Sequence, residues 1–257
     1  MKYLLTLALI MSLFLNPETL NAQGSLRGLL KKATTRDSGT GKTVLGSVLT
    51  SISGSRTGLS ADEIVNGLKE ALTVGTQRSV GKLSSPNGYF SSPFIKILWP
   101  PEAKKVESTL RMVGLGRLVD DAIVSMNRAA EDAAKSAAPI FAQAVTGMSI
   151  QDGWNILKGN NQAATQYLRS RTSTDLTEVF RPVIQQSLNK VNATQYWEKV
   201  MTAYNKISFQ HINPNLAEYV TGKALDGLFY QIGQEETLIR QNPGSRSTEL
   251  LKKVFAN

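Results

Sequence analysis

The 257-residue sequence contains no cysteine and one histidine, His211. Without cysteine the chain has no disulfide, no thiolate metal ligand and no cysteine nucleophile. A serine–histidine pair or a histidine metal site would have to use His211, which lacks the Glu-x-x-His and His-x-x-x-His spacings of such sites. The Gly-x-Ser-x-Gly motif of serine hydrolases is also absent. The sequence therefore predicts no catalytic residue, no metal ligand and no cofactor site, and it favours a protein that is not an enzyme.

Long apolar runs are also scarce, and the longest, Leu4 to Leu15, lies at the N-terminus. Its twelve residues would span about 18 Å as a helix, which is too short for a bilayer core of about 30 Å. Lys2 precedes the run, and Leu20-Asn21-Ala22 follows it with a small residue at the cleavage position. This pattern predicts a signal peptide over residues 1–22 and a mature chain without a transmembrane span, exported to the periplasm or cell envelope.

Acidic residues are fewer than basic ones, which gives a formal net charge of +9. Outside the cytoplasm, an excess of cations favours an anionic envelope component as partner, either a lipid headgroup or a polysaccharide. Residues 39–43 read Gly-Thr-Gly-Lys-Thr, like part of a phosphate-binding loop, but Arg36 stands where that motif needs its first glycine. We therefore predict no nucleotide binding.

The composition divides the mature chain at about residue 59. Residues 23–58 are rich in Gly, Ser and Thr with scattered cations, which is typical of a flexible linker. From residue 59 onward apolar residues recur at helical spacing, and no hairpin signal separates alternating strands. We expect residues 59–257 to form one all-α domain, a bundle of roughly eight to ten helices with an irregular, proline-bounded segment near residues 83–101.

One stretch is expected to organise this domain. Apolar residues three and four apart draw a single stripe from Val119 to Phe141, and the middle of the stripe is alanine. We predict one buried helix here, with the other helices packed around it. Downstream, separate helices are expected over 162–171 and from 173 onward, and Pro182 should kink or divide the second.

Seven short motifs of the folded region identify a family. They are Glu70–Thr76, Leu115–Asp120, Ser125–Glu131, Ala163–Tyr167, Tyr204–Ile207, Lys223–Tyr230 and Leu250–Phe255. Together these motifs resemble the bacterial family called domain of unknown function 4197. The resemblance covers roughly Leu59 to the C-terminus, with the motifs in the expected order. It implies an exported envelope protein and supplies no activity, substrate or catalytic residue.

Pairs of adjacent acidic residues are the remaining candidates for acid–base chemistry. Neighbouring residues on a helix diverge by about 100°, so the two carboxylates of a pair do not face each other. Each pair also has a cation four residues away, which predicts ordinary surface ion pairs. The predicted ion pairs are Arg117 with Asp121, Lys135 with Glu131, and Arg240 with Glu236.

Four residues are candidates for binding a ligand: Asn127, Arg128, Asp226 and Tyr230. Arg128 either points into a groove, where its planar guanidinium could bind a carboxylate or phosphate, or points outward and pairs with Asp132. The outward orientation is favoured.

The main functional hypothesis is a non-enzymatic envelope protein that binds an acidic or amphipathic partner. The alternative is a hydrolase whose carboxylates converge in a helical cleft, with Asp120, Asp121, Glu131 and Asp226 as the candidates.

Overall fold

A computed structural model describes residues 60–206, 211–246 and 248–254. All of them belong to one compact unit, Arg56–Asn257. The predicted signal peptide, the predicted linker and the loop-like sequence at 39–43 lie outside the described residues. Within the described ranges, no helix has the length and apolar character needed to cross a membrane.

The fold is all-α, as predicted, and the described residues contain no strand. Two short 3-10 helices, η1 and η2, accompany the α-helices. The elements are α3 (Ala61–Leu83), η1 (Pro101–Ala103), α4 (Lys104–Met112), α5 (Gly116–Ala134), α6 (Ala137–Thr146), α7 (Ile150–Lys158), α8 (Ala163–Lys190), α9 (Ala193–Asn205), α10 (Leu216–Gln241), η2 (Pro243–Ser245) and α11 (Glu249–Val254).

The predicted central stripe is buried, but it is divided between two helices. Its members are 8% exposed or less from Val119 to Phe141. The prediction of one continuous helix is wrong, because α5 ends at Ala134 and α6 begins at Ala137. Pro139 explains the break: its ring has no N–H and would clash with the carbonyl four residues earlier, that of Lys135. The chain therefore turns at residues 135–136.

Further along the chain, two helices that were predicted to be separate form one helix. Helices were expected over 162–171 and from 173 onward, but α8 is a single helix of 28 residues that contains Pro182 without being divided by it.

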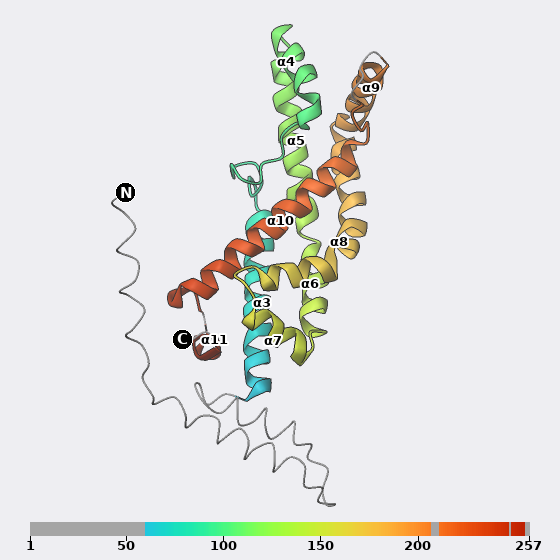
Figure 1. Ribbon diagram of the computed structural model, residues 1–257. Helices are drawn as coiled ribbons and strands as arrows, with labels where there is room; N and C mark the ends of the chain where they lie inside the picture. Colours follow the sequence, from blue (N-terminus) through green and yellow to red (C-terminus); the bar gives the residue numbers. More distant parts are fainter. Residues whose placement is uncertain (1–59, 207–210, 247, 255–257) are drawn as a thin grey trace, which may run out of the picture. The chain divides into compact units, whose positions relative to one another are not determined.

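Three helices form the centre of the unit: α10 packs on α8 and α5, and α5 packs on α8. Figure 1 shows α10 running obliquely across α3, α5 and α8. Helix α3 also contacts α6, α7 and α11.

The proline-bounded segment between α3 and η1 is irregular, as predicted, and it lies across the helices. Its apolar side chains differ in exposure: Ile95 and Ile97 are buried, whereas Phe94 and Leu98 are exposed. Tyr89 enters the core completely and donates a hydrogen bond from its hydroxyl to the carbonyl of Ala224 (2.8 Å). The segment is thereby fixed to α10, and its last residues place Trp99 just before η1 and α4.

Candidate functional site: an apolar groove between two helical hairpins

Two helical hairpins extend to the same end of the domain (Figure 1). The first is α4–α5, whose turn contains Gly114 at φ +83°, a conformation that favours glycine. The second is α8–α9, whose turn contains Asn192 at φ 55°. Asparagine is among the few other residues that adopt this left-handed conformation readily. Both turns reverse the chain within a few residues. Side chains from both hairpins line one pocket between them.

A groove of about 450 Å³ lies between the hairpins. This volume falls within the range of about 300–1,000 Å³ that is usual for small-molecule sites. The lining is mainly aliphatic and aromatic, with Trp99 from the preceding segment and Leu216 at the start of α10. The hairpins contribute Leu110, Leu118, Asp121, Ala122, Val124, Ser125, Met126, Val191, Ala193, Tyr196, Trp197, Val200 and Met201.

Several groove side chains are exposed to solvent although they are apolar. Tyr196 is 56% exposed, Val191 53% and Leu118 46%. Single exposed apolar residues are common on soluble proteins, but a contiguous set that lines a concavity marks a binding site. We therefore take this groove as the candidate functional site.

Two tryptophans lie side by side in the groove. The rings of Trp99 and Trp197 meet edge to face with their centroids 5.1 Å apart. The indole N–H of Trp197 donates to the carbonyl of Asn213 (3.3 Å). Among the described residues, Trp99 Nε1 is the one buried side-chain polar atom without a hydrogen-bond partner. A buried donor without an acceptor is uncommon in proteins.

Two polar side chains of the groove, Asp121 and Ser125, belong to α5. Asp121 is the one carboxylate in the lining, and its contact with Arg117 is long (3.9 Å) and highly exposed. The Ser125 hydroxyl donates to the main-chain carbonyl of Asp121 (2.8 Å). An apolar trough with a thin polar rim suits a molecule that has an apolar body and a polar end.

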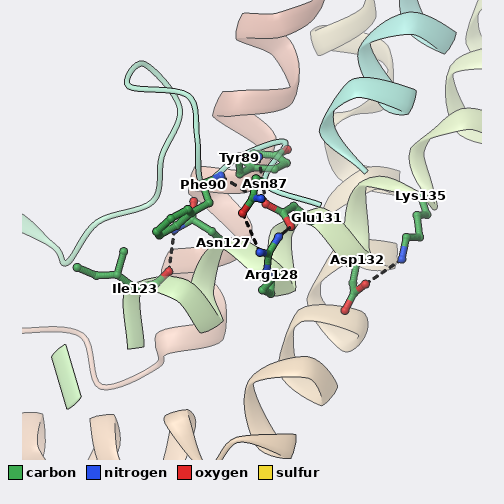
Figure 2. Close-up of polar contacts among 9 residues, drawn as sticks. All are labelled: Asn87, Tyr89, Phe90, Ile123, Asn127, Arg128, Glu131, Asp132 and Lys135. Atoms are coloured by element: carbon green, nitrogen blue, oxygen red, sulfur yellow. Dashed lines mark hydrogen bonds and ion pairs between the residues drawn. The ribbon is translucent and has the colours of Figure 1, made fainter. Parts of the chain in front are cut away.

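Asn127, one of the four predicted ligand residues, is fully buried and does not line the groove. Figure 2 shows it on α5 beside Ile123. Its side-chain oxygen accepts from the backbone N–H of Ile97 (2.9 Å), and its amide nitrogen donates to the Ile97 carbonyl (2.8 Å). The same nitrogen donates to the carbonyl of Ile123 (2.8 Å). The side chain thus pairs with both main-chain groups of Ile97, two residues before Trp99.

Arg128 is turned toward α5's own Glu131 and toward the loop at residue 87 (Figure 2). Its guanidinium forms an ion pair with the Glu131 carboxylate and donates to the side-chain oxygen of Asn87 (2.8 Å). The predicted pairing with Asp132 is therefore wrong, because Asp132 pairs with Lys135 (2.9 Å). This pairing also corrects the predicted contact of Lys135 with Glu131.

The buried carboxylate of Glu131 joins the loop to α5. It accepts from the backbone N–H groups of Tyr89 (3.3 Å) and Phe90 (3.4 Å). Burial, together with the nearby charge of Glu131, raises the pKa of Tyr89 well above its ordinary value. These contacts hold the loop in place, and together with Arg128 they give both carboxylate oxygens of Glu131 a partner.

Asp226 and Tyr230 lie on α10 and outside the groove. Asp226 pairs with Arg169 (3.4 Å) and Lys223 (4.0 Å), and its side chain is 60% exposed. Tyr230 stacks on Phe94 with the ring centroids 5.8 Å apart. None of the four predicted residues lines the groove, and a ligand-binding role for them stays a prediction.

The carboxylates of the alternative hydrolase hypothesis have separate surroundings. Asp120 pairs with Arg111 (2.8 Å), whereas Asp121 pairs with Arg117 as predicted. Two further cavities, of about 430 Å³ beside α7 and about 30 Å³ beside α10, contain one carboxylate each, as the groove does: Asp152 and Glu236. Within the described ranges, no group of three His, Asp or Glu side chains could hold a metal ion.

The predicted ion pair of Glu236 with Arg240 forms, but it is not an ordinary surface pair. The two charged groups lie 2.9 Å apart, and both side chains are nearly buried. The carboxylate also accepts from the backbone N–H groups of Ala164 (3.0 Å) and Thr165 (2.8 Å) at the start of α8. It therefore satisfies amides that a helix N-terminus leaves unpaired.

The sequence did not reveal the groove, because its apolar, helically spaced residues look like those of a hydrophobic core. Tyr196 and Val200 have the four-residue spacing of an ordinary packed helix face. The available signal was the width of the apolar face, since Tyr196, Trp197, Val200 and Met201 spread over about 140° of the helix circumference.

Comparison with known proteins gives one match. The family model described as "Protein of unknown function (DUF4197)" matches residues 58–256, and the chain belongs to this family. No curated protein and no solved structure matches the chain.

Proposed function

We propose that this member of the DUF4197 family is a non-enzymatic binding protein of the cell envelope, and that its partner is a single-chain amphiphile held in the groove between α4–α5 and α8–α9. The predicted signal sequence supports the location. The observation that carries the proposal is the groove itself: about 450 Å³, lined mainly by apolar side chains, several of them left open to water.

The size of the groove favours an extended chain over a protein segment. A helix with its side chains is about 10–12 Å wide and rises about 5.4 Å per turn, so that a single turn occupies roughly 400–600 Å³. The groove therefore holds about one turn of helix, which gives few anchoring side chains. An alkyl chain bends to fit an irregular trough, and its polar end can remain at the rim near Asp121 and Ser125.

Affinity should rise with the length of the apolar chain until the groove is filled. Each buried methylene contributes about 0.8 kcal/mol, which is about fourfold in the dissociation constant. Titration calorimetry with a series of saturated fatty acids measures this slope directly. Trimethylammonium and alcohol amphiphiles of the same chain length then show which head group the rim accepts.

The chain offers a closely matched pair of variants for this test. Val200 on α9 lines the groove and is 37% exposed, and Val179 on α8 has the same exposure but does not line it. Val200→Glu places a charge in the apolar trough and should weaken fatty-acid binding about tenfold or more, whereas Val179→Glu should leave it unchanged.

Two results would contradict the proposal. One is the absence of any measurable binding across the chain-length series, and the other is an equal loss of binding in the two variants. Turnover of an ester amphiphile that depends on Asp121 would instead support the hydrolase alternative.

A further inference from the structure

The tip of the α4–α5 hairpin carries an unusual group of exposed apolar side chains. Within seven residues, Met112 is 78% exposed, Val113 64%, Leu115 47% and Leu118 46%. No residue of α4 is buried. Figure 1 shows this tip at the far end of the hairpin from α6 and α7. We name these four residues the tip patch.

We propose that the tip patch inserts into the surface of a lipid bilayer, from which the groove takes its amphiphile. The inference rests on the proposed function in one respect only: the groove supplies the destination for the lipid. The bilayer contact itself is argued from the patch.

The shape and area of the patch favour lipid over a protein partner. Four partly exposed side chains at a convex turn offer on the order of 400 Å², about half of the roughly 800 Å² per partner of a stable protein interface. Met112, Val113 and Leu115 line neither the groove nor the two further cavities, so this part of the patch lacks the pockets in which protein hot spots are anchored. A fluid bilayer surface needs neither a large area nor a complementary shape.

The patch is continuous with the groove. Leu118 belongs to the patch and also lines the groove, and Leu110 extends the same lining on α4. An amphiphile leaving the bilayer at the tip would therefore meet apolar side chains along its path to Trp99 and Trp197.

The charges beside the patch indicate an apolar rather than an electrostatic contact. Arg111 is paired with Glu107 (3.1 Å) and Asp120 (2.8 Å), and Arg117 lies 3.9 Å from Asp121. The two cations are thus matched locally by acids. Binding should consequently occur on zwitterionic vesicles and should depend weakly on salt.

Vesicle flotation tests the inference. The chain, purified in the form in which the cell holds it, is mixed with phosphatidylcholine vesicles, with and without phosphatidylglycerol, at low and high salt. The double variant Met112→Ser, Val113→Ser removes the two most exposed patch residues, neither of which lines the groove. Its matched control is Val179→Ser, Leu238→Ser, which removes two exposed aliphatic residues elsewhere.

The expected result is about a tenfold weaker partition of the tip variant into both kinds of vesicle, with the control unchanged. Fatty-acid titration without vesicles should be the same for all three proteins, so a failure of vesicle binding is distinguishable from a failure of the groove. Absence of vesicle binding by the wild type would overturn the inference. So would an equal loss in the control, or binding that needs anionic lipid and disappears in high salt.

Discussion

Replacement of Asn127 by alanine tests how the floor of the groove is held. Asn127 is fully buried and satisfies both the N–H and the carbonyl of Ile97. Ile97 is itself 2% exposed, so neither group can turn to bulk water in the variant. The lost contacts would loosen the segment that carries Trp99 to the groove.

The size of the effect follows from the two orphaned groups. A buried polar group that loses its partner costs about 1–3 kcal/mol, so Asn127→Ala should lower the free energy of unfolding by about 2–6 kcal/mol. A water molecule entering the vacated space would bring the cost toward the lower value. The free energy of unfolding of a small domain is about 5–15 kcal/mol in total, so the variant should still fold at low temperature.

Urea unfolding followed by circular dichroism measures the difference. Asn155→Ala is the control, because Asn155 is exposed on α7 and should change the free energy of unfolding by less than about 0.5 kcal/mol. The reasoning is refuted if Asn127→Ala is as stable as that control. A stable variant that loses only ligand affinity would instead support the binding role predicted from the sequence.

Three further changes probe other contacts of the fold. Gly227→Ala should lower stability by about 1–3 kcal/mol, because a Cβ there would lie 2.6 Å from the buried ring of Tyr89, and thermal unfolding measures the loss. Glu236→Ala should cost about 3–5 kcal/mol in urea unfolding, since it leaves a nearly buried arginine without its carboxylate; a cost below 1 kcal/mol would contradict the buried pair. Ser149→Ala should lower the free energy of unfolding by about 1 kcal/mol at neutral pH, because the hydroxyl caps α7. The hydrogen bonds from Ser149 lower the pKa of Asp152, so the part of this contribution that comes from the hydroxyl's bond to the Asp152 carboxylate is present above the ordinary range near 4 and is lost as the pH falls through the lowered pKa. The cap on the Asp152 N–H does not titrate and remains; a loss that does not shrink at all in acid would be inconsistent with the carboxylate bond.

The helical class was predictable because local patterns and tertiary packing agree. The capping box of Ser60 and Glu63 is a local signal that starts α3, and the alanine-rich stripe is buried along its whole length, as predicted. The element boundaries were less predictable where proline was involved. Pro139 lies in the first turn of α6, just after the break, whereas Pro182 lies in the middle of α8. Periodicity alone does not distinguish a proline at which a new helix starts from one that the packing accommodates inside a helix.

The site was harder to predict because it depends on which apolar side chains lack a covering partner. Helical spacing identifies an apolar face, but it cannot tell that the face of Val200 meets a trough rather than a neighbouring helix. The same limit applies to polar residues. Asn127 and Arg128 looked available for a ligand, although their partners, Ile97 and Asn87, come from a segment 30 or more residues away.

Tryptophan fluorescence gives the most direct test of the groove as a binding site. The chain has three tryptophans, of which Trp99 and Trp197 line the groove and Trp154 does not. In a Trp154→Phe variant, a fatty acid brominated along its chain should quench the remaining emission saturably, because the bromines contact both indoles. In the complementary Trp99→Phe, Trp197→Phe variant, the emission of Trp154 should be unaffected. Quenching of Trp154 alone, or of neither variant, would contradict the account.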